Sequence, residues 1–316
     1  MKVVILDGYS VTQGDLDWSA LPYPHVVFDR TAPEDTVARC TGAEAVLTNK
    51  VVLSADIIDR LPQLRYIGVL ATGYNVVDCD AARRHGIVVT NIPSYSTASV
   101  AQLVFAHLLN VVNSVGHYAQ AADRWPLSPD FTWSDTPLTE LAGRTFVVYG
   151  MGHIGSAVAR IALAFGMKVL AVTSKSAGEL PDGVVKVEWE SALRQADVLS
   201  VHCPLTPSTQ GMINRATLAA MKPSAILINT GRGPLVDESA VADALHAGRL
   251  GAYCADVLSA EPPSADNPLL SAPRCYLTPH IAWATLEARR RLIDIAVHNL
   301  RAFVEGTPLN VVNGVL

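Results

Sequence analysis

The stretch FVVYGMGHIGSAVARIALAFGMKVLAVTSKS, at residues 146–176, decides the fold of this chain. A strand-like apolar run ends at Gly150, and Gly152 and Gly155 then open a segment whose apolar residues follow a helical period. A second apolar run, KVLAVT, comes directly after that segment. The order of strand, glycine-rich turn, helix and strand predicts a βαβ unit with parallel strands.

Glycines at this spacing, in this context, are typical of a turn that binds a dinucleotide. Gly150 would end the strand, Gly152 would let the backbone approach a pyrophosphate, and Gly155 would allow the helix to pack closely on the strand. The helix that opens with His153 and Ile154 would present free N–H groups to the phosphates. We therefore predict a dinucleotide site on this turn.

The residues after the second apolar run bear on the choice of dinucleotide. An Asp or Glu about 20 residues past the glycines accepts hydrogen bonds from the ribose hydroxyls of NAD and repels the extra phosphate of NADP. Here Thr173 holds that place, followed by Ser174 and Lys175. Hydroxyl donors and a cation suit a 2′-phosphate, so the loop favours NADP(H) over NAD(H). The alternative is that the loop tolerates either cofactor, with Lys175 pointing into solvent.

Composition limits the class of protein. The chain has 316 residues, half of them apolar, which is enough for two domains. A formal charge of −5 without long runs of like charge argues against a nucleic-acid partner. Five cysteines without a C-x-x-C pair predict reduced thiols in a cytoplasmic protein. Only four apolar residues precede Asp7, too few for a signal peptide, and polar residues interrupt the apolar segment 100–115, which argues against a membrane span.

Short apolar runs alternate with helical patterns from the start of the chain to Pro93, which predicts βα units and a parallel sheet. The five candidate strands lie at residues 2–6, 26–28, 45–48, 66–70 and 87–90. After Pro93 the pattern predicts one long helix from about Ser99 to Ala122. The segment 123–141 has no clear period and reads as a long loop whose aromatic residues are packed. We expect the helix and this loop to form a homodimer interface.

The βα pattern resumes at Arg144 and predicts a second, larger parallel sheet. Its six candidate strands are FVVYG, KVLAVT, VLSVHCP, AILINTG, AYCADVL and CYLTPH, a number typical of a doubly wound dinucleotide domain. The helical segment TLEARRRLIDIAVHNLRAFVEG, at 285–306, should return to the first domain. We therefore predict an α/β protein with a substrate domain at 1–96 and 286–316 and an NAD(P)-binding Rossmann domain at 97–285.

Three side chains able to do chemistry follow predicted strands, where open α/β sheets bind ligands. Arg232 follows AILINTG, Glu261 follows CADVLSA, and His280 follows CYLTP. Each alone is compatible with an ordinary loop residue. Together they supply a proton donor that works at neutral pH, a carboxylate that orients its ring, and a planar cation for a carboxylate or carbonyl oxygen.

These motifs resemble the D-2-hydroxyacid dehydrogenases, and within that family the bacterial glycerate dehydrogenases, also called hydroxypyruvate reductases. The resemblance covers nearly the whole chain and rests on residues 71–91, 99–109, 150–155, 201–209, 228–241, 255–263 and 278–285. It implies a Rossmann cofactor domain and a flavodoxin-like substrate domain, both doubly wound parallel-sheet domains, with an active-site cleft between them. It also implies that Arg232 binds substrate and polarises its carbonyl, that Glu261 is the carboxylate partner, and that His280 is the general acid/base.

The resemblance implies further binding residues. Backbone amides of Ala71, Thr72, Gly73 and Tyr74 would hold the substrate carboxylate, and Asp256 would meet the nicotinamide carboxamide. Other residues fall on segments that line the cofactor: Val100, Cys203, Pro204, Thr209, Thr230, Gly231 and Arg232. Two more have competing interpretations. Lys50 adds a cation at the mouth of the cleft or is a solvated strand end, and Trp283 shapes the substrate pocket or packs between domains.

The resulting functional prediction is a reversible, NAD(P)H-dependent reductase that converts small 2-oxo acids, such as hydroxypyruvate and glyoxylate, to D-2-hydroxy acids. We expect no metal. Two alternatives stay open: a related dehydrogenase of another substrate, such as phosphite or another 2-hydroxy acid, and a dinucleotide-sensing regulatory protein on the same fold. Formate enzymes are disfavoured, because they carry Gln where this chain has Glu261.

Overall fold

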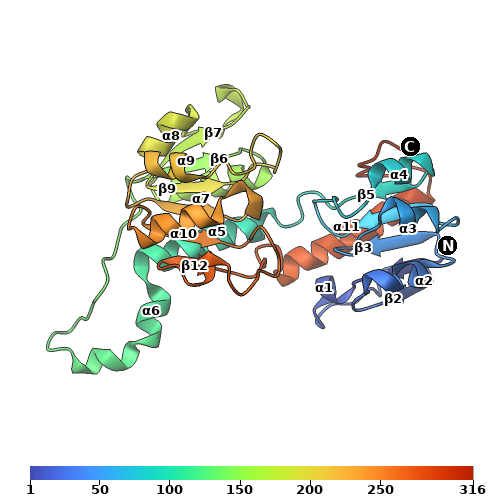
Figure 1. Ribbon diagram of the computed structural model, residues 1–316, viewed down its shortest axis with the longest axis horizontal. Coiled ribbons are helices and arrows are strands. Elements are labelled where there is room, and N and C mark those ends of the chain that lie inside the picture. Colours follow the sequence, from blue (N-terminus) through green and yellow to red (C-terminus); the bar gives the residue numbers. More distant parts are fainter. Residues whose placement is uncertain (316) are drawn as a thin grey trace. The chain divides into compact units, whose positions relative to one another are not determined.

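The computed structural model describes residues 1–315, and the chain divides into two compact units (Figure 1). Unit 1 consists of Met1–Ser96 and Ala284–Leu316, and unit 2 of Thr97–Trp283. Residue 316, the last of the predicted substrate domain, lies outside the described residues. Unit 1 is therefore assembled from both ends of the chain, whereas unit 2 is one continuous segment.

Unit 1 is built on a parallel sheet of five strands with the order β2-β1-β3-β4-β5, which is the flavodoxin-like order. The strands are β1 (Val3–Ile5), β2 (His25–Val27), β3 (Ala45–Thr48), β4 (Tyr66–Val69) and β5 (Val88–Thr90). All five strands predicted from the sequence are present. The residues of the three central strands are buried on both faces of the sheet, which explains their continuous apolar runs.

Helices cover both faces of this sheet. One face packs against α2 (Thr36–Cys40), α3 (Ala55–Asp59) and α4 (Cys79–Arg84). On the other side, α11 (Leu286–Val304) places Phe303 against Tyr66 with ring centroids 5.0 Å apart. The short helix α1 (Tyr9–Thr12) is joined to α11 by Arg289, which is 4% exposed and donates to the carbonyl oxygens of Val11 and Thr12 at 3.1 and 3.0 Å. The predicted C-terminal helix is thus present and belongs to unit 1.

Unit 2 is built on a parallel sheet of seven strands with the order β12-β11-β10-β9-β6-β7-β8. The strands are β6 (Thr145–Tyr149), β7 (Lys168–Val172), β8 (Val184–Lys186), β9 (Val198–Val201), β10 (Ile226–Asn229), β11 (Ala252–Ala255) and β12 (Cys275–Leu277). The sequence predicted six of them and missed β8, a three-residue edge strand whose side chains are half-buried or exposed. The order reverses between β6 and β9, so the ligand-binding switch point of a doubly wound sheet lies there.

Two helical layers sandwich this sheet (Figure 1). The helices α5 (Thr97–Asn113) and α7 (His153–Ala164) share one apolar core with one face of the sheet. The helices α8 (Trp189–Gln195), α9 (Arg215–Ala220) and α10 (Glu238–His246) share a second core with the other face. Within residues 1–315, no helix is long and apolar enough to cross a membrane.

The long helix predicted from Ser99 to Ala122 is interrupted. The helix α5 ends at Asn113, Ser114 adopts a left-handed φ of 50°, and α6 (Val115–Gln120) and a 3-10 segment, η2 (Ala122–Leu127), follow. The apolar face of α5 packs inside unit 2, where Phe105 stacks on Phe146 with centroids 5.8 Å apart. The long apolar segment of α5 is therefore explained by its place in the core of unit 2.

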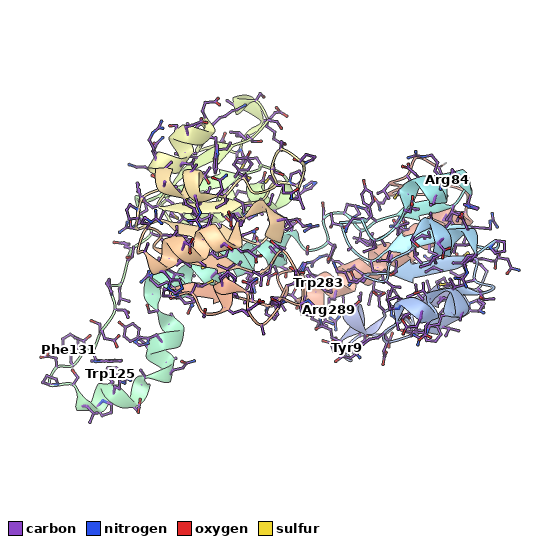
Figure 2. The ribbon with its side chains drawn as sticks, viewed as in Figure 1. Tyr9, Arg84, Trp125, Phe131, Trp283 and Arg289 are labelled. Carbon is purple, nitrogen blue, oxygen red and sulfur yellow. The ribbon has the colours of Figure 1, made fainter. Side chains whose placement is uncertain are left out.

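Residues 114–140, which we call the arm, lead away from the sheet of unit 2 (Figure 1). The arm folds on itself: His117 Nε2 lies 2.7 Å from Asp135 Oδ1, and the ring of Trp133 packs edge-on against Tyr118. The prediction that the other aromatic residues of the arm are packed was wrong within a single chain. Trp125 and Phe131, near the far end of the arm in Figure 2, are 58% and 91% exposed.

Candidate active site

The glycine turn after β6 explains why each of its three glycines is needed. Gly150 has a φ of +97°, and a Cβ there would lie 2.8 Å from the backbone of His202 and Cys203. A Cβ on Gly155 would lie 1.9 Å from the carbonyl oxygen of Gly150, so α7 can approach β6 only without a side chain. A Cβ on Gly152 would meet no heavy atom of the described chain within 4 Å. Gly152 therefore leaves room for a group from outside the protein.

The N-terminus of α7 faces the same space. Gly152 is its N-cap and offers no side-chain cap, and Ser156 is the first residue of the turn whose N–H donates to a backbone carbonyl, that of Gly152. In the described chain, the N–H groups of His153, Ile154 and Gly155 donate to no protein acceptor. A row of open N–H groups at the positive end of a helix binds phosphate oxygens. The predicted pyrophosphate site therefore fits this turn.

A cavity of about 670 Å³ opens beside this helix end. Its lining includes Gly152 and His153, at the start of α7, and Lys175, from the loop after β7. Thr173 supports this loop, since its Oγ1 accepts a hydrogen bond from the N–H of Lys175 at 3.2 Å, and Ser174 is exposed.

Two charged residues of the cavity escaped the sequence prediction. Arg160, on α7, and Glu179, in the loop between β7 and β8, both line it. The spacing of seven residues between His153 and Arg160 is a signal that could have revealed the first, because it places them on one face of a helix. The pattern Ser176-x-x-Glu179, a capping box, is the signal that could have linked Glu179 to Ser176.

The other predicted cofactor residues lie on the elements expected. Val100 is buried on α5, Cys203 and Pro204 follow β9, and the Thr209 hydroxyl holds that loop by donating to the Pro204 carbonyl at 2.8 Å. Thr230, directly after β10, is 8% exposed. Its Oγ1 is one of two buried side-chain N or O atoms in residues 1–315 without a hydrogen-bond partner. An unpaired buried hydroxyl costs about 1–3 kcal/mol, which indicates that a ligand supplies the partner.

The three candidate catalytic residues follow neighbouring strands. β10 pairs with β11, and β11 with β12, in parallel register, with Asn229 opposite Ala255 and Ala255 opposite Leu277. Parallel strands in register end at the same edge of the sheet, so the loops that carry Arg232, Glu261 and His280 begin side by side.

His280 and Glu261 form a direct pair, with 2.6 Å between Nδ1 and Oε2. The second oxygen of Glu261 accepts the N–H of Leu258 at 3.0 Å, which fixes the orientation of the carboxylate. The tautomer assigned by this geometry donates from Nδ1 and leaves Nε2 of the half-buried ring for another partner. His280 also has a left-handed φ of 54°, uncommon for a residue with a side chain and typical of functional sites.

Asp256 holds the turn that carries His280. Its side chain is 1% exposed, and its two oxygens accept the Thr278 hydroxyl at 2.6 Å and the N–H groups of Ile281 and Ala282 at 2.9 and 2.8 Å. Sequence reasoning assigned Asp256 only to the nicotinamide carboxamide and missed this role. The two backbone donors, which directly follow His280, are visible only in three dimensions.

The Arg232 turn packs against the loop that leads to Glu261. A Cβ on Gly233 would lie 2.0 Å from the carbonyl carbon of Leu258, so the two backbones touch. Asn229 shapes the turn, because its amide donates to the Arg232 carbonyl at 2.9 Å and its oxygen accepts the Gly231 N–H at 3.0 Å. The exposed Arg232 side chain donates to the Gly231 carbonyl at 2.7 Å.

The predicted substrate-binding loop lies in unit 1, directly after β4. Its shape is fixed by Thr72, whose hydroxyl donates to the Ile92 carbonyl at 2.9 Å, and by the Ile92 N–H, which donates to the Ala71 carbonyl at 3.0 Å. In the described part of the chain, the N–H groups of Thr72, Gly73 and Tyr74 donate to no protein acceptor. Three neighbouring N–H groups suit an anionic ligand.

Two further predicted residues lie at the ends of other elements. Lys50 follows β3, and buried Asp7 fixes this turn by accepting the N–H groups of Asn49 and Lys50 at 2.8 and 2.6 Å. Burial raises the pKa of the Asp7 carboxyl, and these hydrogen bonds oppose the rise. Trp283 is half-buried and is the last residue of unit 2. The structure thus gathers the catalytic candidates in unit 2 and the substrate-loop candidates in unit 1.

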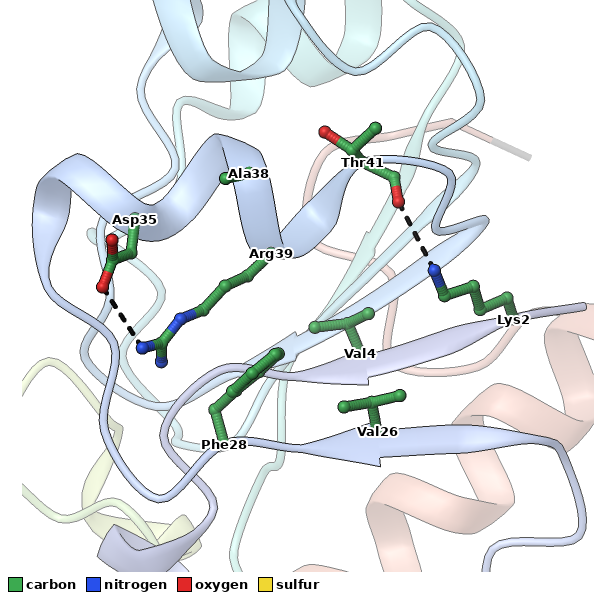
Figure 3. A pocket seen from close by; sticks show the side chains of 8 residues that line it. All are labelled: Lys2, Val4, Val26, Phe28, Asp35, Ala38, Arg39 and Thr41. Atoms are coloured by element: carbon green, nitrogen blue, oxygen red, sulfur yellow. Dashed lines mark hydrogen bonds and ion pairs between the residues drawn. The ribbon is translucent and has the colours of Figure 1, made fainter.

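Unit 1 has a cavity of its own, of about 310 Å³ beneath α2 (Figure 3). Its cations contact protein groups. Arg39 pairs with Asp35 at 3.2 Å and lies over the Phe28 ring, and Lys2 Nζ is 3.5 Å from the Thr41 carbonyl oxygen. The charges that line this cavity are therefore satisfied without a ligand.

This chain is similar to known proteins over nearly its whole length. Residues 105–282 match the family described as D-isomer specific 2-hydroxyacid dehydrogenase, NAD binding domain. The chain belongs to this family. It is similar to a hydroxypyruvate reductase of Blautia hydrogenotrophica, with 45% identity over 99% of this chain and 100% of the relative, and to a glycerate dehydrogenase of Methylorubrum extorquens, with 41% identity over 98% of each.

A crystal structure of a Thermus thermophilus protein has a TM-score of 0.83 and 34% identity to this dehydrogenase, and the match covers 99% of this chain and 100% of that one. The predicted family, the α/β fold with two parallel sheets and the assignment as an oxidoreductase are confirmed. Within residues 1–315 of the dehydrogenase, no group of three or more His, Cys, Asp or Glu side chains is placed to hold a metal ion. Its glycine turn, open helix end and unpaired Thr230 hydroxyl fit a nicotinamide dinucleotide.

Proposed function

We propose that this dehydrogenase reduces small 2-oxo acids, such as hydroxypyruvate and glyoxylate, to D-2-hydroxy acids, reversibly and with NAD(P)H. The observation that carries the proposal is the 2.6 Å pair of His280 and Glu261, beside the turn that carries Arg232. The names of the Blautia hydrogenotrophica and Methylorubrum extorquens relatives support it.

The residues of unit 2 would divide the chemistry among them. The bound nicotinamide supplies the hydride that reaches the carbonyl carbon. As negative charge develops on the carbonyl oxygen, the Arg232 guanidinium stabilises it and His280 donates a proton from Nε2. Glu261 accepts a hydrogen bond from Nδ1, which fixes the orientation and the tautomer of the ring. In the oxidising direction, neutral His280 takes the proton back at the same nitrogen.

The substrate's own carboxylate requires donors, and we assign them to unit 1. The open N–H groups of Thr72, Gly73 and Tyr74 would bind it, with Lys50 adding positive charge. Ala71 positions the loop through its bond with Ile92, and Tyr74, on the same loop, would limit the size of the substrate side chain. One methylene in such a pocket changes discrimination by about 1–3 kcal/mol.

A panel of substrates tests the reaction. Absorbance of NADPH and NADH would be followed with glyoxylate, hydroxypyruvate, pyruvate, 2-oxoisocaproate and phenylpyruvate. We expect the highest kcat/KM with hydroxypyruvate or glyoxylate. Absence of oxidation with all five would contradict the proposal, and phosphite-dependent reduction of NADP+ would establish the alternative substrate.

We also propose that NADPH is preferred over NADH. No carboxylate stands at Thr173, and the cavity beyond it is lined by the cations Lys175 and Arg160, which suit a 2′-phosphate. Thr173→Asp would keep an acceptor for the Lys175 N–H while adding a negative charge, so we expect it to shift the preference toward NADH. The measurement is kcat/KM for both cofactors, and a wild-type preference for NADH of more than about tenfold would refute this assignment.

We propose that the protein is a homodimer whose subunits meet through the arm. Large apolar side chains are exposed along it, namely Val115, Trp125, Leu127, Phe131 and Leu138. Exposed apolar patches of this kind mark protein interfaces. Sedimentation at micromolar concentration should give a dimer, and replacing Trp125 and Phe131 with Ser should give a monomer; a wild-type monomer would contradict the proposal.

The five free cysteines accord with the cytoplasmic location that we propose.

A further inference from the structure

The cavity beside α7 contains charges of both signs. Lys175 and Arg160 bring positive charge to its lining, and Glu179 brings a carboxylate into the same lining. Glu179 ends the 3-10 segment η3 (Ala177–Glu179), in the loop between β7 and β8. A dinucleotide whose phosphates bind the N-terminus of α7 would extend its adenosine ribose toward this loop, as in other doubly wound folds.

The contacts of Glu179 hold it at this place as an anion. Its Oε2 accepts both the N–H and the hydroxyl of Ser176, at 2.8 and 2.7 Å. These hydrogen bonds, with smaller contributions from the charges of Lys175 and Lys186, lower the pKa of the Glu179 carboxyl below its usual value. Both donors of Ser176, its N–H and its hydroxyl, are therefore already bound to an anion of the protein.

We propose that Glu179 is a specificity-determining residue that competes with the 2′-phosphate of NADPH for Ser176 and Lys175, and so limits the preference for NADPH over NADH. The inference rests on the proposed cofactor site. A 2′-phosphate entering this cavity meets a like charge and must displace it from Ser176. The 2′-hydroxyl of NADH carries no charge and can donate to the same carboxylate. Glu179 thus supplies, from farther along the same loop, the acidic group that Thr173 does not provide.

Glu179→Gln isolates the charge, because a glutamine oxygen can still accept from Ser176. Dissociation constants for NADPH and NADH would be measured by isothermal titration calorimetry on the intact protein. We expect NADPH to bind about fivefold more tightly, as for one exposed like charge removed, and NADH to change by less than about twofold. Glu188→Gln, which removes an exposed carboxylate at the start of α8, is the matched control and should change neither constant.

Two further measurements assign the effect to the 2′-phosphate. Adenosine 2′,5′-bisphosphate should respond to Glu179→Gln as NADPH does, whereas 5′-AMP should not respond. In a Lys175→Met background the gain should shrink, because the cation for which the two anions compete is gone. If glutamine disturbs the loop, Glu179→Ala is the second variant, and it should also tighten the binding of NADPH.

Equal changes for NADPH and NADH, or no change for either, would overturn the inference while leaving the proposed function intact. A wild-type protein that binds neither dinucleotide would overturn both.

Discussion

Alanine at Gly152 should weaken cofactor binding, whereas alanine at Gly155 should disrupt the packing of α7 on β6. Gly155→Ala places a Cβ 1.9 Å from the Gly150 carbonyl oxygen, well inside the 3.0 Å that real Cβ contacts respect, so α7 must move away from β6 by about 1 Å. Overpacking of this kind costs about 1–3 kcal/mol or more. Thermal unfolding should then show a Tm lower by about 2–4 °C for each kcal/mol.

Gly152→Ala should leave the fold intact. Its φ of −72° and ψ of −163° suit alanine, and the new Cβ meets nothing within 4 Å in residues 1–315. Loss of glycine's freedom in the unfolded chain should even raise stability by about 0.4–1 kcal/mol. The methyl group occupies the space that we assign to the pyrophosphate, so the Kd for NADPH should rise at least about tenfold.

The assay pairs calorimetric titration of NADPH with thermal unfolding of the cofactor-free protein. A Gly152→Ala protein that binds NADPH with wild-type affinity would refute the assignment of this turn. A Gly155→Ala protein with an unchanged Tm would refute the packing argument. Because the two substitutions add the same methyl group to neighbouring positions, each serves as the control for the other.

Four further predictions concern the chemistry and the pH dependence. His280→Ala should lower kcat by at least about 100-fold with little change in the Kd for NADPH, and a loss below about fivefold would exclude it as the proton donor. Glu261→Gln removes the carboxylate that holds Nδ1 of His280, so kcat should fall with little change in the Kd for NADPH; an unchanged kcat would exclude that role. Arg232→Lys should also be costly, since an ammonium cannot replace a planar fork, and near-native turnover would contradict the proposed binding mode. Burial lowers the pKa of His202 from 6.5 to about 4, so the unfolded chain binds the proton at higher pH than the folded chain does, and the free energy of unfolding falls as pH drops from 6.5 toward 4. In urea titrations between pH 6.5 and 5, the free energy of unfolding of His202→Asn should therefore fall less steeply than that of the wild type. Equal slopes would contradict this.

The sequence was informative where a single local pattern determines the structure. The five strands of unit 1 could be found because strands buried on both faces form short continuous apolar runs. The position of the catalytic candidates could be predicted from topology, because parallel strands place their following loops at one edge of the sheet. Because the loops that carry His280 and Glu261 leave the same edge, the two side chains can meet, and they do so at 2.6 Å.

Features that depend on three-dimensional neighbours could not be predicted in this way. β8 was missed because an edge strand of three residues, half-buried or exposed, leaves almost no apolar signal. The long helix was extended past Ser114 because nothing local to that serine announces its left-handed φ of 50°. Two of the three partners of Asp256 are backbone N–H groups, which every residue but proline carries and which no residue letter distinguishes.

The assembly of unit 1 from both ends of the chain has a consequence for biosynthesis. The ribosome releases β1 to β5 first, but the face of their sheet that holds Tyr66 lacks α11 until Phe303 has been made. Unit 2 is continuous and has its own cores, so it can fold during translation while unit 1 waits for the last helix. The nascent chain therefore carries an uncovered apolar sheet face through most of its synthesis, and this is the stage at which chaperones would act on it.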